Sequence, residues 1–147
     1  MRAQLVLVSL TAILSGCSPG FVLHLYNATD ETITVSYPPY RMTDTIQPHA
    51  AGDVGVAGDF VISTPAHSWF YPQTAARPPV ALFQQHTMLW RAFGRIDSRG
   101  RIYVLAPPKG EGAPREITQP AGFPLQPHQR PNQAVERTAT RCAFISR

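Results

Sequence analysis

An alternation of apolar and polar residues that is ended by proline is the feature that most restricts the fold of this chain. In residues 32–37, Ile33, Val35 and Tyr37 alternate with hydroxyl-bearing residues, and Pro38 follows. Period-two alternation is typical of a strand with one buried face. Proline ends such a strand because it has no N–H to donate to a neighbouring strand. We therefore expect short strands here.

Short strands bounded by turn formers recur through residues 21–107. We expect residues 21–26 and 32–37 to form an opening hairpin across the turn formers of residues 27–31. A second hairpin is predicted at residues 95–105, because Asp97 and Gly100 suit the first and fourth positions of a type I turn followed by a glycine bulge. Further strands are predicted at residues 42–47, 53–56, 59–63 and 68–71. The pattern predicts an all-β fold, a small antiparallel β-sandwich or barrel-like domain.

Residues 80–93 fit two interpretations. Their large apolar side chains recur at helical spacing, with Pro79 before them and Gly94 after them, as at the ends of a helix. Residues 88–96, however, also suit a strand paired with residues 101–105. We expect a helical or irregular turn up to about His86 and a strand after it.

The composition changes after Pro107. Seven prolines lie between Pro107 and Pro131, and few large apolar residues accompany them. Such a segment buries too little surface to offset its ordering entropy. We therefore predict one globular domain at residues 21–107 and a disordered, proline-rich tail at residues 108–147.

The first 16 residues have the order of a secretory signal peptide. Met1 and Arg2 give a positive start, residues 3–13 are mostly apolar, and Leu14, Ser15 and Gly16 precede Cys17. As a helix the apolar run would span about 18 Å, whereas the hydrocarbon core of a bilayer is about 30 Å thick. The run therefore suits a cleaved leader better than a membrane span.

Leu14-Ser15-Gly16-Cys17 resembles the lipobox of bacterial lipoproteins. The resemblance implies cleavage before Cys17, a diacylglycerol thioether on its sulfur, and an acyl chain such as palmitate on the freed amine. Several chains anchor a protein firmly, whereas one gives marginal, reversible binding. Because lipoproteins retained at the inner membrane commonly have Asp after the cysteine, Ser18 implies the outer membrane, with the domain facing the periplasm. An ordinary signal peptide with an incidental Cys17 is the alternative.

The predicted anchor leaves a short tether at residues 17–20. The three residues after Cys17 reach about 10 Å, which predicts a domain held at the membrane surface.

The tail contains the second cysteine of the chain, Cys142. If Cys17 carries lipid, Cys142 has no cysteine of this chain to pair with, and it is then a free thiol, an intermolecular bridge or an incidental residue of the tail. Residues 131–139, Pro-Asn-Gln-Ala-Val-Glu-Arg-Thr-Ala, resemble a run at the ends of unrelated short bacterial reading frames that accompany mobile gene cassettes. That resemblance implies translated repeat sequence and no activity.

The charge distribution argues against nucleic acid as a partner. The formal net charge is +4, but residues 18–106 contain six arginines against six acidic residues, and the excess of positive charge lies in the tail. A neutral domain has no basic stripe to track a phosphate backbone.

Two groups of residues are candidates for binding. His86 and Met88 would offer imidazole and a soft sulfur from one face of a strand, a pair that suits copper(I). The pair resembles the end of the motif of periplasmic copper chaperones, but the methionine which that motif needs about twenty residues upstream is missing. The run Trp69, Phe70 and Tyr71 would suit a sugar, a peptide or a lipid surface if exposed. For Met88 and for the aromatic run, core packing is the alternative.

No catalytic constellation emerges from the sequence. There is no Gly-x-Ser-x-Gly elbow and no phosphate-binding loop. We interpret His24 as facing solvent, and His49, Asp53 and Asp59 as belonging to turns. We therefore expect a lipid-anchored envelope protein that is not an enzyme, needs no cofactor and acts as an interaction or accessory module. Its partners would be membrane lipid through Cys17 and an envelope protein; a periplasmic domain that binds a small ligand or copper is the alternative.

Overall fold

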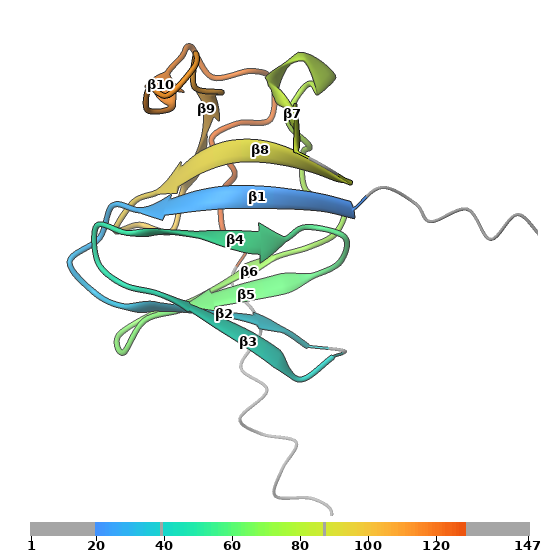
Figure 1. Ribbon diagram of the computed structural model, residues 1–147. Helices are drawn as coiled ribbons and strands as arrows, with labels where there is room; N and C mark the ends of the chain where they lie inside the picture. Colours follow the sequence, from blue (N-terminus) through green and yellow to red (C-terminus); the bar gives the residue numbers. More distant parts are fainter. Residues whose placement is uncertain (1–19, 39, 87, 129–147) are drawn as a thin grey trace, which may run out of the picture.

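The structure is a computed structural model that describes residues 20–38, 40–86 and 88–128. These residues form strands joined by turns and by longer loops, with one turn of 3₁₀ helix, as Figure 1 shows. The elements are β1 (Gly20–Asn27), β2 (Ile33–Tyr37), β3 (Met42–Ile46), β4 (Ala51–Gly55), β5 (Phe60–Ser63), β6 (Ser68–Tyr71), η1 (Val80–Leu82), β7 (Gln84–His86), β8 (Leu89–Ile96), β9 (Ile102–Ala106) and β10 (Arg115–Glu116).

The strands form two sheets that pack face to face, which confirms the predicted all-β sandwich (Figure 1). The first sheet has the order β10-β9-β8-β1-β4, with β7 paired to the start of β8, and the second has the order β3-β2-β5-β6. All these pairs are antiparallel except β1 and β8, which run parallel from Gly20 opposite Leu89 to Asn27 opposite Ile96. Both strands therefore begin at the same end of the sandwich.

The hydrophobic core lies between the sheets and follows the alternation in the sequence. Leu23 and Leu25 of β1 are buried against Ile33 and Val35 of β2 and their neighbours. The polar or aromatic residues between them point to the outer faces. β1 and β2 therefore each contribute one apolar face to the core, as a two-layer sandwich requires.

The predicted opening hairpin is wrong, although both of its strands exist. β1 pairs with β4 and β8, whereas β2 pairs with β3 and β5, so the chain crosses from one sheet to the other between them. The crossing is held by Asn27, which is fully buried. Its amide nitrogen donates to the carbonyl oxygens of Glu31, Ile46 and Gln47, and its oxygen accepts from the backbone N–H and the hydroxyl of Thr29. Asn27 thus ties the crossing to the turn after β3.

The second predicted hairpin is confirmed. β8 and β9 pair from Phe93 opposite Leu105 to Ile96 opposite Ile102. At the turn the N–H of Gly100 donates to the carbonyl oxygen of Asp97 over 2.9 Å, and Gly100 has a φ of +74°, as a glycine bulge requires.

The predicted helical turn before β8 is shorter than expected, because η1 ends at Leu82 and β7 is already a strand.

The predicted boundary of the domain at residue 107 is also wrong. Residues 108–128 pack along the open edge of the sandwich: β10 pairs with β9, Leu125 exchanges backbone hydrogen bonds with Ile102, and His128 does so with Phe70 of β6. Few apolar residues are needed here, because the segment closes an edge that already exists. Residues 129–147, with Cys142 and the run 131–139, lie outside the described residues, as do residues 1–19 with Cys17.

Candidate functional site

A largely apolar cavity of about 370 Å³ lies between the two sheets at the end where β1 and β8 begin. Its volume is within the range of about 300–1,000 Å³ that is usual for small-molecule pockets. Large side chains from both halves of the chain form its walls: Phe21, Leu23, Phe60, Phe83, Val104 and Leu125. We call this space the inter-sheet pocket.

The pocket exists because small residues take the places where large ones would close the core. Ala57 and Gly58 after β4, and Ala75 and Ala76 after β6, line it and leave the space unfilled. A Cβ atom added to Gly58 would meet no atom within 4 Å. At the wall, Phe21 meets Phe83 edge to face, with ring centroids 5.6 Å apart.

Arg77 is the charged residue among those that line the inter-sheet pocket. It lies on the segment between β6 and η1 and is exposed to solvent. In the part of the chain that the structure describes, its guanidinium has no ion-pair partner. The other polar side chain of the lining, Gln73, is already engaged, because its amide nitrogen donates to the carbonyl oxygen of Ala57 over 2.9 Å.

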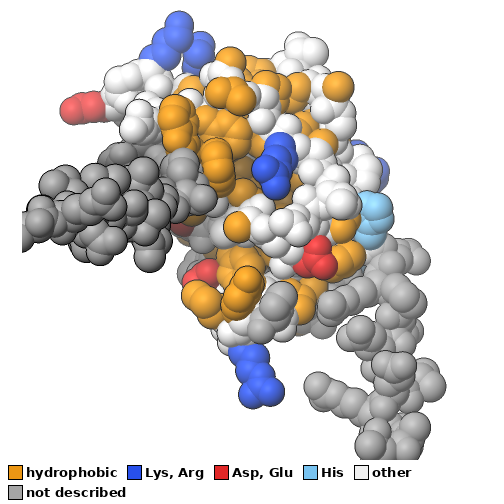
Figure 2. All heavy atoms as spheres, turned by 90° about the vertical axis from the view of Figure 1, so that its right-hand side faces the viewer, with side chains coloured by type: hydrophobic (Ala, Val, Ile, Leu, Met, Phe, Trp, Pro, Cys, Tyr) orange, Lys and Arg blue, Asp and Glu red, His pale blue; other side chains and the backbone are white. Residues whose placement is uncertain are grey.

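The same end of the sandwich carries most of the exposed large apolar side chains. Of the seven among the described residues, only Tyr26 lies toward the other end of β1. Figure 2 looks at this end and shows apolar side chains gathered over it, with single charged groups between them. We call this surface the apolar end and define it by Phe21, Tyr40, Met42, Val80, Met88 and Leu89.

The charges at the apolar end are balanced. Arg41 and Arg77 are exposed there, and so are Asp44 and Asp59. A second and more open hollow of about 510 Å³, lined by Tyr37, Tyr40, Asp44 and Asp59 among others, adjoins the inter-sheet pocket through Ala57, Gly58 and Gln73. An apolar partner therefore suits this end better than a strongly charged one.

A polar cluster lies elsewhere, on the outer face of the first sheet. The Nδ1 atom of His24 is 2.7 Å from one carboxylate oxygen of Asp53, and Arg91 donates to the other over 2.9 Å. His24 also meets Phe93 edge to face. No hydroxyl or thiol of the described residues is hydrogen-bonded to His24. The cluster joins β4, β1 and β8, and among the described residues it places no hydroxyl or thiol nucleophile beside the imidazole.

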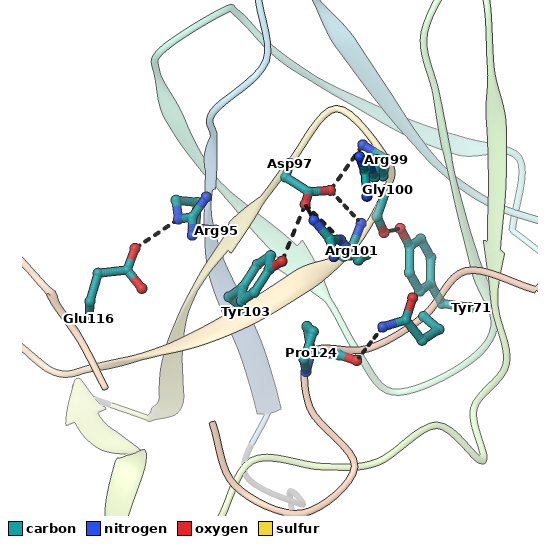
Figure 3. Close-up of polar contacts among 10 residues, drawn as sticks. Tyr71, Arg95, Asp97, Arg99, Gly100, Arg101, Tyr103, Glu116 and Pro124 are labelled. Carbon is teal, nitrogen blue, oxygen red and sulfur yellow. Dashed lines mark hydrogen bonds and ion pairs between the residues drawn. The ribbon is translucent and has the colours of Figure 1, made fainter. Parts of the chain in front are cut away.

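The aromatic run is not the exposed surface that one interpretation predicted. Trp69 and Tyr71 are buried in the core, as the alternative expected, and Phe70 is half-buried between them. The hydroxyl of Tyr71 donates to the carbonyl oxygen of Gly100 in the β8–β9 turn, as Figure 3 shows. Burial, with a smaller contribution from the charge of Asp97, raises the pKa of Tyr71 far above its ordinary value. The run therefore holds the turn and offers no binding surface.

Of the two copper candidates, the structure describes only the side chain of Met88. Met88 is exposed in the turn between β7 and β8, so the alternative that it packs in the core is wrong. The side chain of His86 lies outside what the structure describes. Among the described residues, no group of three His, Cys, Asp or Glu side chains is placed to hold a metal ion.

The residues of the inter-sheet pocket were missed by sequence reasoning. A signal was present in residues 72–80, where alanine and proline replace the alternation of a strand and Arg77 interrupts the run. Such a segment crosses the end of a sandwich without filling it.

Within the described residues, no helix has both the length and the apolar character to cross a membrane. No protein-family profile matches this chain, and comparison with curated proteins and with solved structures found no similar protein.

Proposed function

We propose that this protein is a lipid-anchored component of the bacterial envelope, attached through Cys17 to the periplasmic face of the outer membrane. The sandwich stands with its apolar end against the bilayer and serves as a non-enzymatic interaction module. The observation that carries the proposal is that exposed apolar side chains gather at the end where β1, the first described strand, begins. An exposed apolar surface of this kind is typical of an interaction site.

The length of the tether supports this orientation. Three residues separate Cys17 from Phe21, and they span at most about 10 Å. Phe21 and Leu89 lie at the starts of the parallel strands β1 and β8, so a bilayer that holds lipid on Cys17 comes within reach of both. The balanced charges of this end favour apolar contact with lipid over attraction to anionic headgroups.

Membrane fractionation with a matched leader tests the anchoring. In the test variant, residues 1–17 are replaced by a conventional secretory leader, so that the mature chain begins at Ser18 and contains every described residue. We expect the natural chain to stay with outer membranes through an alkaline carbonate wash and the variant to be released. Retention of the variant to the same extent as the natural chain would contradict the proposal.

A broad hydrolase assay on the released chain tests the absence of enzymatic activity. We expect no turnover above background. Reproducible turnover that is abolished by one change in the polar cluster, for example His24→Ala, would contradict the non-enzymatic part of the proposal. A second change on the same sheet but outside the cluster, Tyr103→Phe, serves as the control.

A further inference from the structure

We propose that the inter-sheet pocket binds the alkyl chain of a fatty acid, whose carboxylate pairs with Arg77. The lining is largely apolar, and the cavity of about 370 Å³ is large enough to hold an alkyl chain. A saturated chain needs no specific polar partner along its length. The space between two sheets lined by alanine, glycine and phenylalanine meets that requirement.

Arg77 supplies the selectivity for an acid. It is the charged group of the lining, and it has no ion-pair partner among the described residues. A guanidinium donates two parallel hydrogen bonds to a carboxylate, which neutral alcohols and esters cannot accept in the same way. An amphiphile with its chain among Phe21 and Phe83 and its carboxylate at Arg77 satisfies both parts of the site.

The source of the ligand follows from the position of the pocket. Phe21 and Val80 belong both to the lining and to the apolar end. If that end faces the bilayer, a fatty acid passes from the membrane into the pocket without crossing water. This choice of source depends on the proposed function, whereas binding itself does not.

Titration of the delipidated chain that begins at Ser18 tests the binding. The probes are decanoate and dodecanoate below their micellar concentrations, with dodecanol as the neutral analogue, and the readout is isothermal titration calorimetry. We expect saturable binding of one equivalent, with dodecanoate about 15-fold tighter than decanoate, because each buried methylene contributes about fourfold. Binding without saturation, or with no dependence on chain length, would overturn the proposal.

Variants that fill the pocket locate the site. Ala75→Phe adds a ring at the lining, and Ala66→Phe adds the same ring to the exposed turn between β5 and β6. We expect Ala75→Phe to weaken dodecanoate binding at least tenfold and Ala66→Phe to change it by less than about twofold. Gly58→Leu is the second filling variant, because a Cβ there meets open space. If folded Ala75→Phe and Gly58→Leu both bind like the natural chain, the pocket is not the site.

A charge variant tests the role of Arg77. We expect Arg77→Gln to weaken dodecanoate binding at least about tenfold and to leave dodecanol unchanged. Arg99→Gln, in the turn at the other end of the sandwich, should affect neither ligand. Equal losses for the acid and the alcohol, or an equal effect of Arg99→Gln, would overturn the assignment of the carboxylate to Arg77.

The chain's own acyl group is the competing occupant. If lipid on Cys17 filled the pocket, the lipidated protein would bind no added dodecanoate, whereas the chain that begins at Ser18 would bind it. We expect both forms to bind with the same affinity, and a loss confined to the lipidated form would overturn the proposal. Loss of binding with intact anchoring refutes only the fatty acid site, and intact binding with failed anchoring refutes only the membrane placement.

Discussion

Removing two exposed side chains from the apolar end should weaken its contact with a bilayer by a calculable amount. Val80 is 80 % exposed and Met88 is 73 % exposed, and neither belongs to the buried core. Full burial of such a side chain contributes about 1.5–3 kcal/mol. At the lower end of that range, covering the exposed fractions of both contributes about 2.3 kcal/mol, or roughly a 50-fold change in the partition coefficient.

The assay measures partition of the chain that begins at Ser18 onto zwitterionic phosphatidylcholine vesicles. We expect the double variant Val80→Ser with Met88→Gln to partition about 50-fold less, because both changes replace apolar surface that would contact lipid. The midpoint of chemical unfolding should stay the same, since both side chains are exposed. Added salt should have little effect, because the charges at this end are balanced.

The control lies at the opposite end of β1. Tyr26 is 37 % exposed there, so Tyr26→Gln should change partition by less than about threefold if the sandwich docks by its apolar end. If the double variant partitions within about threefold of the natural chain, or if Tyr26→Gln has an equal effect, the proposed orientation is refuted.

Three further predictions concern the fold that carries the site. Gly100→Ala should lower the free energy of unfolding by at least about 2 kcal/mol more than Gly110→Ala; both glycines have a positive φ, but only a Cβ at Gly100 would lie 2.5 Å from the Trp69 ring, and urea titration measures the difference. Truncation after residue 107 should lower the thermal midpoint by several degrees, and truncation after residue 128 should lower it much less, because residues 108–128 bond to β9 and β6. Burial opposes ionisation of Asp97, but hydrogen bonds from Arg101 and Arg99 outweigh it and hold the pKa of Asp97 below its ordinary value of 3.8. Its contribution to stability should therefore be full above that value and disappear as the pH falls below it, so acid titration should bring the natural chain and Asp97→Asn together.

The strands of the sandwich could be predicted because their signals are local. The alternation around Val35 fixes which face of β2 is buried, and the pair Asp97 and Gly100 fixes the β8–β9 turn. Both depend on residues that are close in the sequence. The all-β class follows from many such segments together.

The pairing of the strands could not be predicted in the same way. β1 finds its parallel partner in β8, about seventy residues later, and no local pattern encodes that choice. The short turn after β1 favoured a hairpin, but the buried amide of Asn27 satisfies three carbonyl groups and turns the chain into the other sheet. In the sequence, an asparagine followed by turn formers indicates a turn, but it does not indicate which sheet the next strand joins.

The proline-rich segment was misjudged for a different reason. Composition shows that residues 108–128 cannot form a core of their own, but it does not show that a neighbouring edge can hold them. Leu125 and His128 both keep the N–H that proline lacks, and both use it on an existing strand. The inter-sheet pocket could not be predicted from the sequence either, because its walls come from segments that are far apart in the chain.

The most direct test of the proposed anchoring is the intact mass of the full-length protein, expressed in a bacterial host and purified in mild detergent from whichever fraction contains it. We expect a chain that begins at Cys17 and carries the added mass of a diacylglycerol thioether and one amide-linked acyl chain. A free sulfur on Cys17, or a chain that still begins at Met1, would contradict both the anchoring and the orientation built on it.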